Sequence, residues 1–234
     1  MKNIKILEEI LLELFFPSKC VICGTYLDGY ICSKCLDSLP IPTNYCKICG
    51  TPLTYPETIC YNCKKGEKYI DELEFLGYYQ GIWEKLITKF KFENKPFLAK
   101  TFAQLGKTKI NKRNWDINYI TFVPMWRDKE IKRGFNQSKV LSIFLSKELN
   151  IKSVSLLHQK RPTLEQKSLN YKDRISNVKD AYKILNNEDI NGKNILLVDD
   201  VYTTGATLNE CAKELKQGGA KVIFSFVICR TILG

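Results

Sequence analysis

The chain has 234 residues, of which 44% are hydrophobic and 12% aromatic, and this composition excludes a disordered protein. The length suits one medium domain with a small one attached. No secretory signal is recognisable, and acidic residues interrupt the apolar N-terminus well before the roughly 18 residues that a membrane span requires. We therefore expect a cytoplasmic protein without a transmembrane segment.

The net charge of +11 is concentrated in the middle of the chain. Residues 81–180 contain 22 Lys and Arg against 9 Asp and Glu, whereas the rest of the chain contains 14 against 16. A basic field of this kind attracts polyanions such as nucleic acid, nucleotides or anionic lipid. A Lys-rich surface without a binding role explains the same numbers, so both interpretations stay open.

The first expected element is an amphipathic helix at residues 3–16, which Pro17 ends. Its polar side carries Glu as well as Lys, which favours packing against the rest of the protein over binding to a membrane. We treat residues 1–17 as a separate segment. Residues 18–66, rich in Cys, Gly, Pro and Tyr, have no helical period and predict a small metal-stabilised domain.

Eight of the ten cysteines form four CxxC pairs, which predict metal sites. The pairs are Cys20 and Cys23, Cys32 and Cys35, Cys46 and Cys49, and Cys60 and Cys63. Two CxxC turns supply four thiolates to one tetrahedral Zn²⁺, so we expect two tandem zinc ribbons, each holding a structural zinc. Gly24 and Gly50 each follow a pair, where a zinc knuckle often needs positive φ. An arrangement in which the first and third pairs share a metal stays open, whereas disulfides and iron–sulfur clusters fit less well.

From residue 67 onward, expected strands alternate with expected helices. The strands are predicted at residues 73–79, 117–124, 194–200 and 221–230, and the helices at residues 81–92, 96–110, 136–149 and 205–219. This alternation predicts an α/β domain over residues 67–234, with a mainly parallel sheet flanked by helices. The polar, basic segment 158–177 lacks a clean period, and we expect a long loop there.

The segment 195–207 places two carboxylates at the end of an apolar strand, followed by a hydroxyl-rich glycine turn. Adjacent carboxylates repel and are costly to desolvate, so we expect a ligand at Asp199 and Asp200. Open parallel sheets bind ligands at the carboxyl ends of their strands, and a glycine turn leading into a helix offers N–H groups to a phosphate. The carboxylates suit sugar hydroxyls or a hydrated Mg²⁺. The segment therefore predicts a site for a ribose 5-phosphate.

This pattern resembles the phosphoribosyl pyrophosphate (PRPP) motif of the type I phosphoribosyltransferases. The resemblance implies that Asp199 and Asp200 bind the ribose hydroxyls, and that Mg²⁺ binds with PRPP. As catalytic residues, the two carboxylates would stabilise a carbocation-like ribose. It implies a loop around the 5-phosphate made by Thr203, Thr204, Gly205, Ala206 and Thr207. It also implies a pyrophosphate site near Pro124, Met125 and Trp126. Arg133, beside that site, suits bidentate contact with the pyrophosphate, which we expect, or an ion pair with Asp128 or Asp173. Purine-salvage members carry an acid/base Asp where Thr203 stands, so the sequence argues against purine salvage.

Over nearly its whole length the chain resembles the ComF family, which includes the ComFC and GntX proteins. The resemblance is carried, in order, by the CxxC pairs, LITKFKF (residues 86–92), KRGFNQS (132–138), RPTLEQKSLNYKDRISNV (161–178) and the phosphate loop. The family implies a role in competence and in the use of DNA. It also implies a location in the cytosol or at the inner face of the membrane, and a competence helicase or an uptake channel as a partner.

The basic middle of the chain fits contact with single-stranded DNA. The candidate contact residues are Arg127, Lys132, Arg161, Lys167, Lys172 and Arg174. Two functions are compatible with these patterns. One is a ComF-like protein that binds PRPP and single-stranded DNA, with or without phosphoribosyl transfer. The other is an ordinary phosphoribosyltransferase that acts on an unidentified base or amine.

Overall fold

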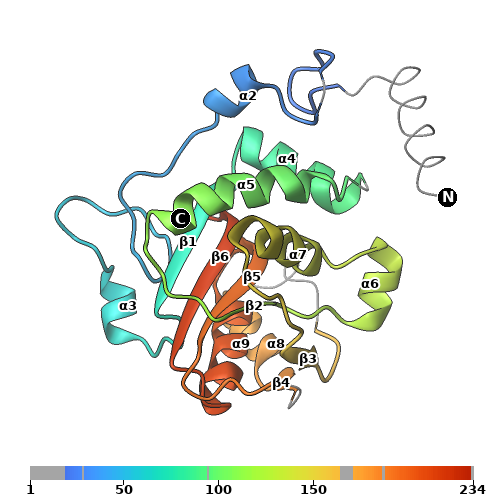
Figure 1. Ribbon diagram of the computed structural model, residues 1–234. Coiled ribbons are helices and arrows are strands. Elements are labelled where there is room, and N and C mark those ends of the chain that lie inside the picture. Colours follow the sequence, from blue (N-terminus) through green and yellow to red (C-terminus); the bar gives the residue numbers. More distant parts are fainter. Residues whose placement is uncertain (1–18, 28, 94, 164–170, 186–187, 233–234) are drawn as a thin grey trace. The chain divides into compact units, whose positions relative to one another are not determined.

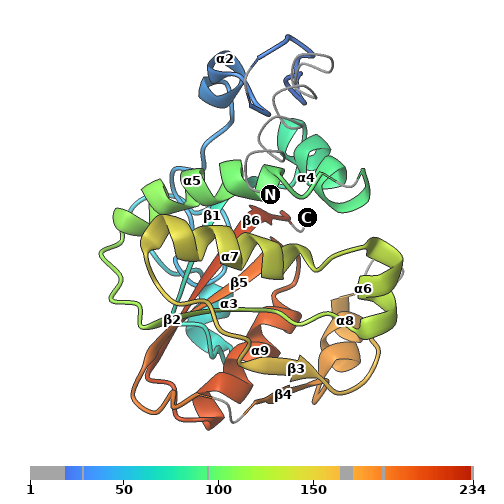
Figure 2. The same cartoon turned by 45° about the vertical axis from the view of Figure 1, so that its right-hand side comes forward.

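The computed structural model describes residues 19–232 apart from 28, 94, 164–170 and 186–187, and omits the side chains of 171, 172, 174 and 175 (Figures 1 and 2). The helix expected at residues 3–16 lies outside the described residues. Contacts divide the chain into two compact units, Met1–Pro40 and Ile41–Gly234. The sequence suggested a boundary after residue 66, whereas the contacts leave residues 41–66 in the larger unit.

Each unit contains one cysteine-rich knuckle followed by a short helix. In the smaller unit an antiparallel bridge between Lys19 and Tyr26 closes the knuckle, and helix α2 (Ser33–Asp37) follows. In the larger unit the bridge joins Tyr45 and Pro52, and the helix is α3 (Tyr61–Lys65). The knuckle glycines have φ values of +77° at Gly24 and +70° at Gly50, so the expected left-handed backbone is confirmed.

The larger unit is built on a four-stranded parallel sheet. Its strands, in spatial order, are β1 (Glu72–Tyr78), β6 (Val222–Arg230), β5 (Asn194–Tyr202) and β2 (Tyr119–Phe122). The strands are largely apolar and buried, as a sheet covered on both faces requires. A separate antiparallel pair consists of β3 (Leu157–Gln159) and β4 (Tyr182–Ile184). The predicted α/β fold with a mainly parallel sheet is confirmed.

Helices cover both faces of this sheet (Figure 1). One face carries α4 (Ile82–Phe92), α5 (Leu98–Asn111) and α7 (Gln137–Leu149), and the other carries α8 (Tyr171–Val178) and α9 (Ala206–Gln217). A further helix, α6 (Arg127–Arg133), follows β2. Within the described residues, no helix has both the length and the apolar content that crossing a bilayer demands.

The expectation of a continuous loop over residues 158–177 is wrong at both ends. Its first residues belong to β3 and its last belong to α8. A three-residue strand is too short to show a period of its own, and it exists because it pairs with β4 beyond the segment. Helix α8 is stabilised by packing against α9, which also lies beyond it in the chain.

The second cysteine cluster is part of the core of the larger unit. Three of its cysteines lie in the same group of buried side chains as Phe75 of β1. Beside it, the buried carboxylate of Glu74 accepts hydrogen bonds from the Tyr45 hydroxyl at 2.6 Å and from Arg113 Nε at 2.7 Å. These charge-assisted bonds join the ribbon, β1 and the residues after α5. The second ribbon is therefore packed on the sheet that carries the phosphate loop.

Candidate functional site

Each compact unit brings four cysteine sulfurs together. One cluster contains Cys20, Cys23, Cys32 and Cys35, the other contains Cys46, Cys49, Cys60 and Cys63, and within each the sulfurs lie within 4.8 Å of one another. The Sγ atoms of Cys23 and Cys32 are 3.8 Å apart, and those of Cys49 and Cys60 are 3.6 Å apart. Zinc bonds of about 2.3 Å place tetrahedral sulfurs about 3.8 Å apart. Both clusters therefore fit structural zinc with consecutive pairs sharing a metal, and the crossed arrangement is wrong.

The two adjacent acids near the carboxyl end of β5 have separate partners. Asp199 accepts a hydrogen bond from the Ser138 hydroxyl at 2.7 Å, at the start of α7. Asp200 forms an ion pair with Lys91 Nζ at 2.8 Å, near the end of α4, and the two side chains are 12% and 18% exposed. The two acids thus connect β5 to α7 and α4.

The carboxyl of Asp199 is a weaker acid than that of an ordinary Asp, because its pKa is raised. Burial raises the pKa of its carboxyl to about 7, and repulsion from Asp200 adds to the increase. Hydrogen bonds from Ser138 and from the Asp200 N–H oppose this shift without cancelling it. The residue as a whole keeps a partly exposed surface. Asp199 therefore keeps its proton up to a higher pH than an ordinary Asp.

We expect Asp199 to make the free energy of unfolding decrease as the pH rises from about 4 to about 7. In that range the folded state keeps a proton on Asp199, whose pKa is about 7, while the unfolded chain, with a pKa near 3.8, has released it. The slope should flatten above pH 7. Urea unfolding at a series of pH values, compared with Asp199→Asn, measures the effect. An equal slope in the variant would show that another group is responsible.

The loop after β5 has a backbone suited to an anion. Gly205 has a φ of +78°, and a Cβ added there would lie 2.1 Å from the ring of Tyr202, so only glycine fits. The Thr204 hydroxyl accepts a hydrogen bond from the Ala206 N–H at 3.3 Å, which orders the entry into α9. The first N–H groups of a helix have no partner within it and attract anions. Residues 203–207 therefore form a turn that can direct backbone N–H groups at a phosphate.

The segment KRGFNQS fastens α7 to the ends of β2 and β5. Gly134 ends α6 in the left-handed conformation, with a φ of +87°. The Asn136 side chain then caps α7 by accepting from two of its backbone N–H groups, and it donates to the Val123 carbonyl at 3.1 Å. Because the cap is anchored to the chain just beyond β2, Ser138 lies within reach of Asp199 on β5.

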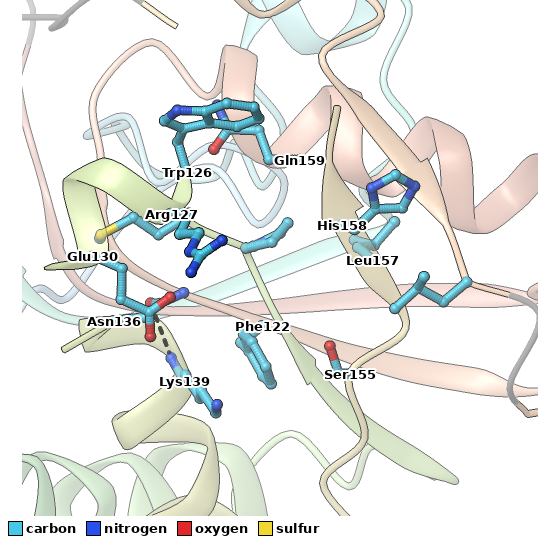
Figure 3. Close-up of a pocket in the computed structure, with 13 residues that line it drawn as sticks. Phe122, Trp126, Arg127, Glu130, Asn136, Lys139, Ser155, Leu157, His158 and Gln159 are labelled. Carbon is cyan, nitrogen blue, oxygen red and sulfur yellow. Dashed lines mark hydrogen bonds between the residues drawn. The ribbon is translucent and has the colours of Figure 1, made fainter. Parts of the chain in front are cut away.

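The expected pyrophosphate region borders a cavity of about 300 Å³ (Figure 3). Its lining consists of Phe122, Pro124, Met125, Trp126, Arg127, Glu130, Asn136, Lys139, Ser155, Leu157, His158, Gln159 and Leu185. Figure 3 shows the indole of Trp126, the guanidinium of Arg127 and the imidazole of His158 around this space. The lining includes Pro124 and Met125 but no residue of 199–207. The cavity is therefore distinct from the phosphate loop.

Arg133 lies at the junction of α6 and α7. Its guanidinium is 5.0 Å from the centre of the Phe92 ring and donates to Gln137 Oε1 at 3.4 Å. Gln137 is buried, and its Nε2 atom has no hydrogen-bond partner among the described residues. A buried amide donor without a partner is costly, which makes it available to a ligand.

The nucleic-acid candidates are only partly described. Arg127 and Lys132 are exposed on α6. Arg161 is exposed and donates to the Lys179 carbonyl at 2.7 Å. The side chains of Lys167, Lys172 and Arg174 lie outside the described residues.

Sequence reasoning did not select three residues that contact the acids or the loop, namely Lys91, Ser138 and Arg230. Lys91 lies in LITKFKF, one of the segments that carry the family resemblance, but its lysine pattern indicates no contact with Asp200. Ser138 lies in the segment that carries the family resemblance. Arg230 offered a signal, because an arginine directly after the apolar run 222–229 needs a buried partner.

Comparisons with known proteins agree with this architecture. The profile of the double zinc ribbon domain matches residues 11–64, and that of the phosphoribosyl transferase domain matches residues 138–232. Competence protein F of Haemophilus influenzae is 33% identical over 222 residues, which cover 89% of this chain and 95% of that protein. DNA utilization protein YhgH of Escherichia coli (strain K12) is 29% identical over 228 residues, covering 94% and 100%. Competence protein ComFC of Bacillus subtilis is 25% identical over 213 residues, covering 87% and 85%. The chain therefore belongs to the ComF family, in which a double zinc ribbon precedes a domain with the type I phosphoribosyltransferase fold.

Proposed function

We propose that this protein binds PRPP with Mg²⁺ at the carboxyl ends of β5 and β2 and holds single-stranded DNA on nearby basic residues. The observation that carries the PRPP site is the arrangement of residues 199–207, in which two acids precede a glycine turn and the start of α9. The turn binds the 5-phosphate, and the carboxylates of Asp199 and Asp200 accept hydrogen bonds from the ribose hydroxyls. PRPP combines a 5-phosphate with a neighbouring diol, which matches the turn and the two carboxylates.

The pyrophosphate group of PRPP is assigned to the segment after β2, residues 123–126. Pro124 and Met125 lie in the segment between β2 and α6 and line the cavity, and Arg133 lies at the end of α6. A guanidinium binds phosphate oxygens in pairs, which suits Arg133 to this contact. Mg²⁺ prefers carboxylate and phosphate oxygens, so Asp199 and Asp200 would help to hold it, and it would offset the negative charge of the pyrophosphate.

Isothermal titration calorimetry with PRPP tests this site. We expect binding in the presence of MgCl₂ and a large loss of affinity when EDTA replaces it, because pyrophosphate binding then lacks its counter-charge. Ribose 5-phosphate, which lacks the pyrophosphate, should bind more weakly and with little dependence on Mg²⁺. If PRPP and Mg²⁺ at millimolar concentrations gave no heat of binding, the proposed site would be contradicted.

The names of the relatives, which refer to competence and DNA utilization, support the DNA-binding part of the proposal. Arg127, Lys132 and Arg161 are exposed cations in the basic middle of the chain. Each phosphate that a protein neutralises on a single strand adds about −0.7 to the slope of log K against log salt, so three contacts give about −2.

Fluorescence anisotropy with a labelled oligothymidylate, between 50 and 300 mM NaCl, measures this slope. We expect Arg127→Gln to weaken binding and to make the slope shallower by about 0.7. Lys64→Gln on α3 removes one exposed charge elsewhere and serves as the matched control. Binding that does not respond to salt would contradict the proposal.

The cavity of Figure 3 favours phosphoribosyl transfer as a second candidate. It adjoins the segment assigned to pyrophosphate, and Trp126 and His158 offer flat faces to an aromatic acceptor. A screen of bases and amines for acceptor-dependent release of pyrophosphate tests this. Release that depends on an acceptor and is lost in Trp126→Ala would establish an enzyme. PRPP binding without turnover would show that the domain binds PRPP but does not transfer its phosphoribosyl group.

A location in the cytoplasm or at the inner face of the membrane, with a competence helicase or an uptake channel as partner, also belongs to this proposal. Its support is the names of the relatives. Crosslinking in competent cells followed by identification of the attached proteins tests it. Recovery without any protein of the uptake machinery would count against it.

A further inference from the structure

Arg230, the last residue of β6, connects the second cysteine cluster to the phosphate loop. Its side chain is buried, and its Nε atom donates to the Cys49 carbonyl at 2.6 Å. Its Nη1 atom donates to the Thr203 carbonyl at 3.0 Å, and its Nη2 atom donates to the Thr51 hydroxyl at 3.4 Å. One guanidinium thus contacts a residue that ligates the metal and the first residue of the loop.

The second cysteine cluster, once loaded with zinc, balances the positive charge of Arg230. None of the ion pairs between described residues involves Arg230. A buried cation without a counter-charge is strongly destabilising. Four thiolates around one Zn²⁺ carry a net charge of −2, because the metal offsets only half of theirs. The loaded cluster therefore supplies the negative charge that Arg230 lacks elsewhere.

The contacts on both sides of Arg230 are tight. Its guanidinium lies 4.9 Å from the centre of the Tyr202 ring, and that ring occupies the space where Gly205 would have a Cβ. On the other side, a Cβ on Gly50 would lie 3.2 Å from Arg230 Cγ and 2.9 Å from the Phe75 ring. A continuous packed path therefore runs from the knuckle through Arg230 to the phosphate loop, and small shifts at one end reach the other.

The bond to Thr203 determines which way the loop presents its backbone. In a planar trans peptide the carbonyl of one residue and the N–H of the next point in opposite directions. Because Arg230 holds the Thr203 carbonyl, the N–H of Thr204 points away from Arg230. A flipped peptide would turn a carbonyl oxygen toward a bound anion and repel it. The arginine therefore selects the loop conformation in which N–H groups are free to face a phosphate.

We propose that Arg230 is a positioning residue through which the second zinc cluster sets the conformation of the phosphate loop. Loss of metal from that cluster then disorders the loop, whereas loss from the first cluster does not. The effect on ligand affinity rests on the proposed PRPP site, but the effect on the loop backbone does not depend on it.

Arg230→Lys tests this proposal, with Arg113→Lys as the matched control. Lysine keeps the charge but cannot bond Cys49 and Thr203 through one planar group. Arg113 is also a partly buried arginine that contacts the second ribbon, at Tyr45, and its hydrogen bonds to described residues go to Tyr45 and Glu74 rather than to the loop. We expect Arg230→Lys alone to speed amide hydrogen exchange at residues 203–209 by at least tenfold, with exchange at 195–198 and the zinc content unchanged.

The ligand readout separates positioning from general damage. We expect Arg230→Lys to weaken ribose 5-phosphate, which depends on this loop, by at least tenfold and to leave pyrophosphate binding unchanged. A merely structural effect would weaken both ligands alike. If the wild-type protein binds neither ligand but Arg230→Lys still loosens the loop, the proposed PRPP site is removed and the positioning role stands.

A second pair of variants covers the case in which Arg230→Lys fails to fold. Gly50→Ala and Gly24→Ala both place alanine at a positive φ, but only position 50 lacks room, since nothing lies within 4 Å of the added Cβ at position 24. Gly50→Ala should displace Arg230 and speed exchange at 203–209, and Gly24→Ala should not. The inference would be overturned if amide hydrogen exchange at residues 203–209 were equal in the two arginine variants, or equal in the two glycine variants.

Discussion

Asp200→Asn is expected to lower the affinity for PRPP by more than 100-fold while the protein stays folded. Each charge-assisted hydrogen bond contributes about 1.5–3 kcal/mol, and the carboxylate is proposed to accept two from the ribose. Asparagine has the same shape, and its amide oxygen can still accept a bond from Lys91, which now lies 2.8 Å from the carboxylate. Calorimetry with PRPP and Mg²⁺ measures the affinity, and circular dichroism follows the fold.

Asp71→Asn is the matched control for that change. Asp71 also forms an ion pair at 2.8 Å, with Lys216, and its carboxylate accepts the Ile223 N–H at 2.7 Å. It lies at the amino end of the sheet, away from the proposed ligand. Its loss should therefore cost stability without changing the affinity for PRPP. Unchanged affinity in Asp200→Asn would show that this carboxylate does not bind the ribose.

Cys60→Ser is expected to unfold the larger unit, whereas Cys32→Ser should affect only the smaller one. The two cysteines occupy equivalent places, since each is the N-cap of the short helix that follows its knuckle. Structural zinc contributes roughly 10–16 kcal/mol of apparent binding free energy, which matches or exceeds the roughly 5–15 kcal/mol stability of a typical domain. The second cluster lies in the core of the larger unit. When its zinc is lost, the sheet of that unit therefore loses the free energy that zinc binding contributed.

Zinc analysis and thermal unfolding measure these effects together. Each variant should lose about one of the two zinc ions expected per chain. The cooperative transition of the larger unit should persist in Cys32→Ser and disappear, or fall to a much lower temperature, in Cys60→Ser. Equal loss of this transition in both variants would contradict the separation of the clusters into two units.

Short-range patterns in the sequence were enough to predict the main elements. Parallel strands such as β5 and helices such as α9 have apolar residues at regular spacing, and this spacing survives in any context. The elements that were missed have no such pattern. Helix α6 has no buried residue, and β3 and β4 are three residues each, so they depend on partners that lie elsewhere in the chain.

The candidate site also combines residues that local patterns indicated with residues that only the fold brought together. The sequence placed Asp199 and Asp200 side by side before the glycine turn, but their partners, Ser138 and Lys91, come from helices that lie far away in the chain. The adjacent carboxylates indicated from the sequence that repulsion would raise a pKa, but burial of Asp199, the largest cause, depends on the surrounding protein.

By itself, the sequence determined the four CxxC pairs, the phosphate loop and the alternation of strands and helices, because each depends on residues close together in the chain. The tertiary structure alone decided which pairs share a metal and that the second cluster is packed on the sheet. It also brought Arg230 to Cys49, 181 residues earlier, and to Thr203, 27 residues earlier. Contacts over such separations depend on which strands become neighbours, and that is settled only when the whole core packs.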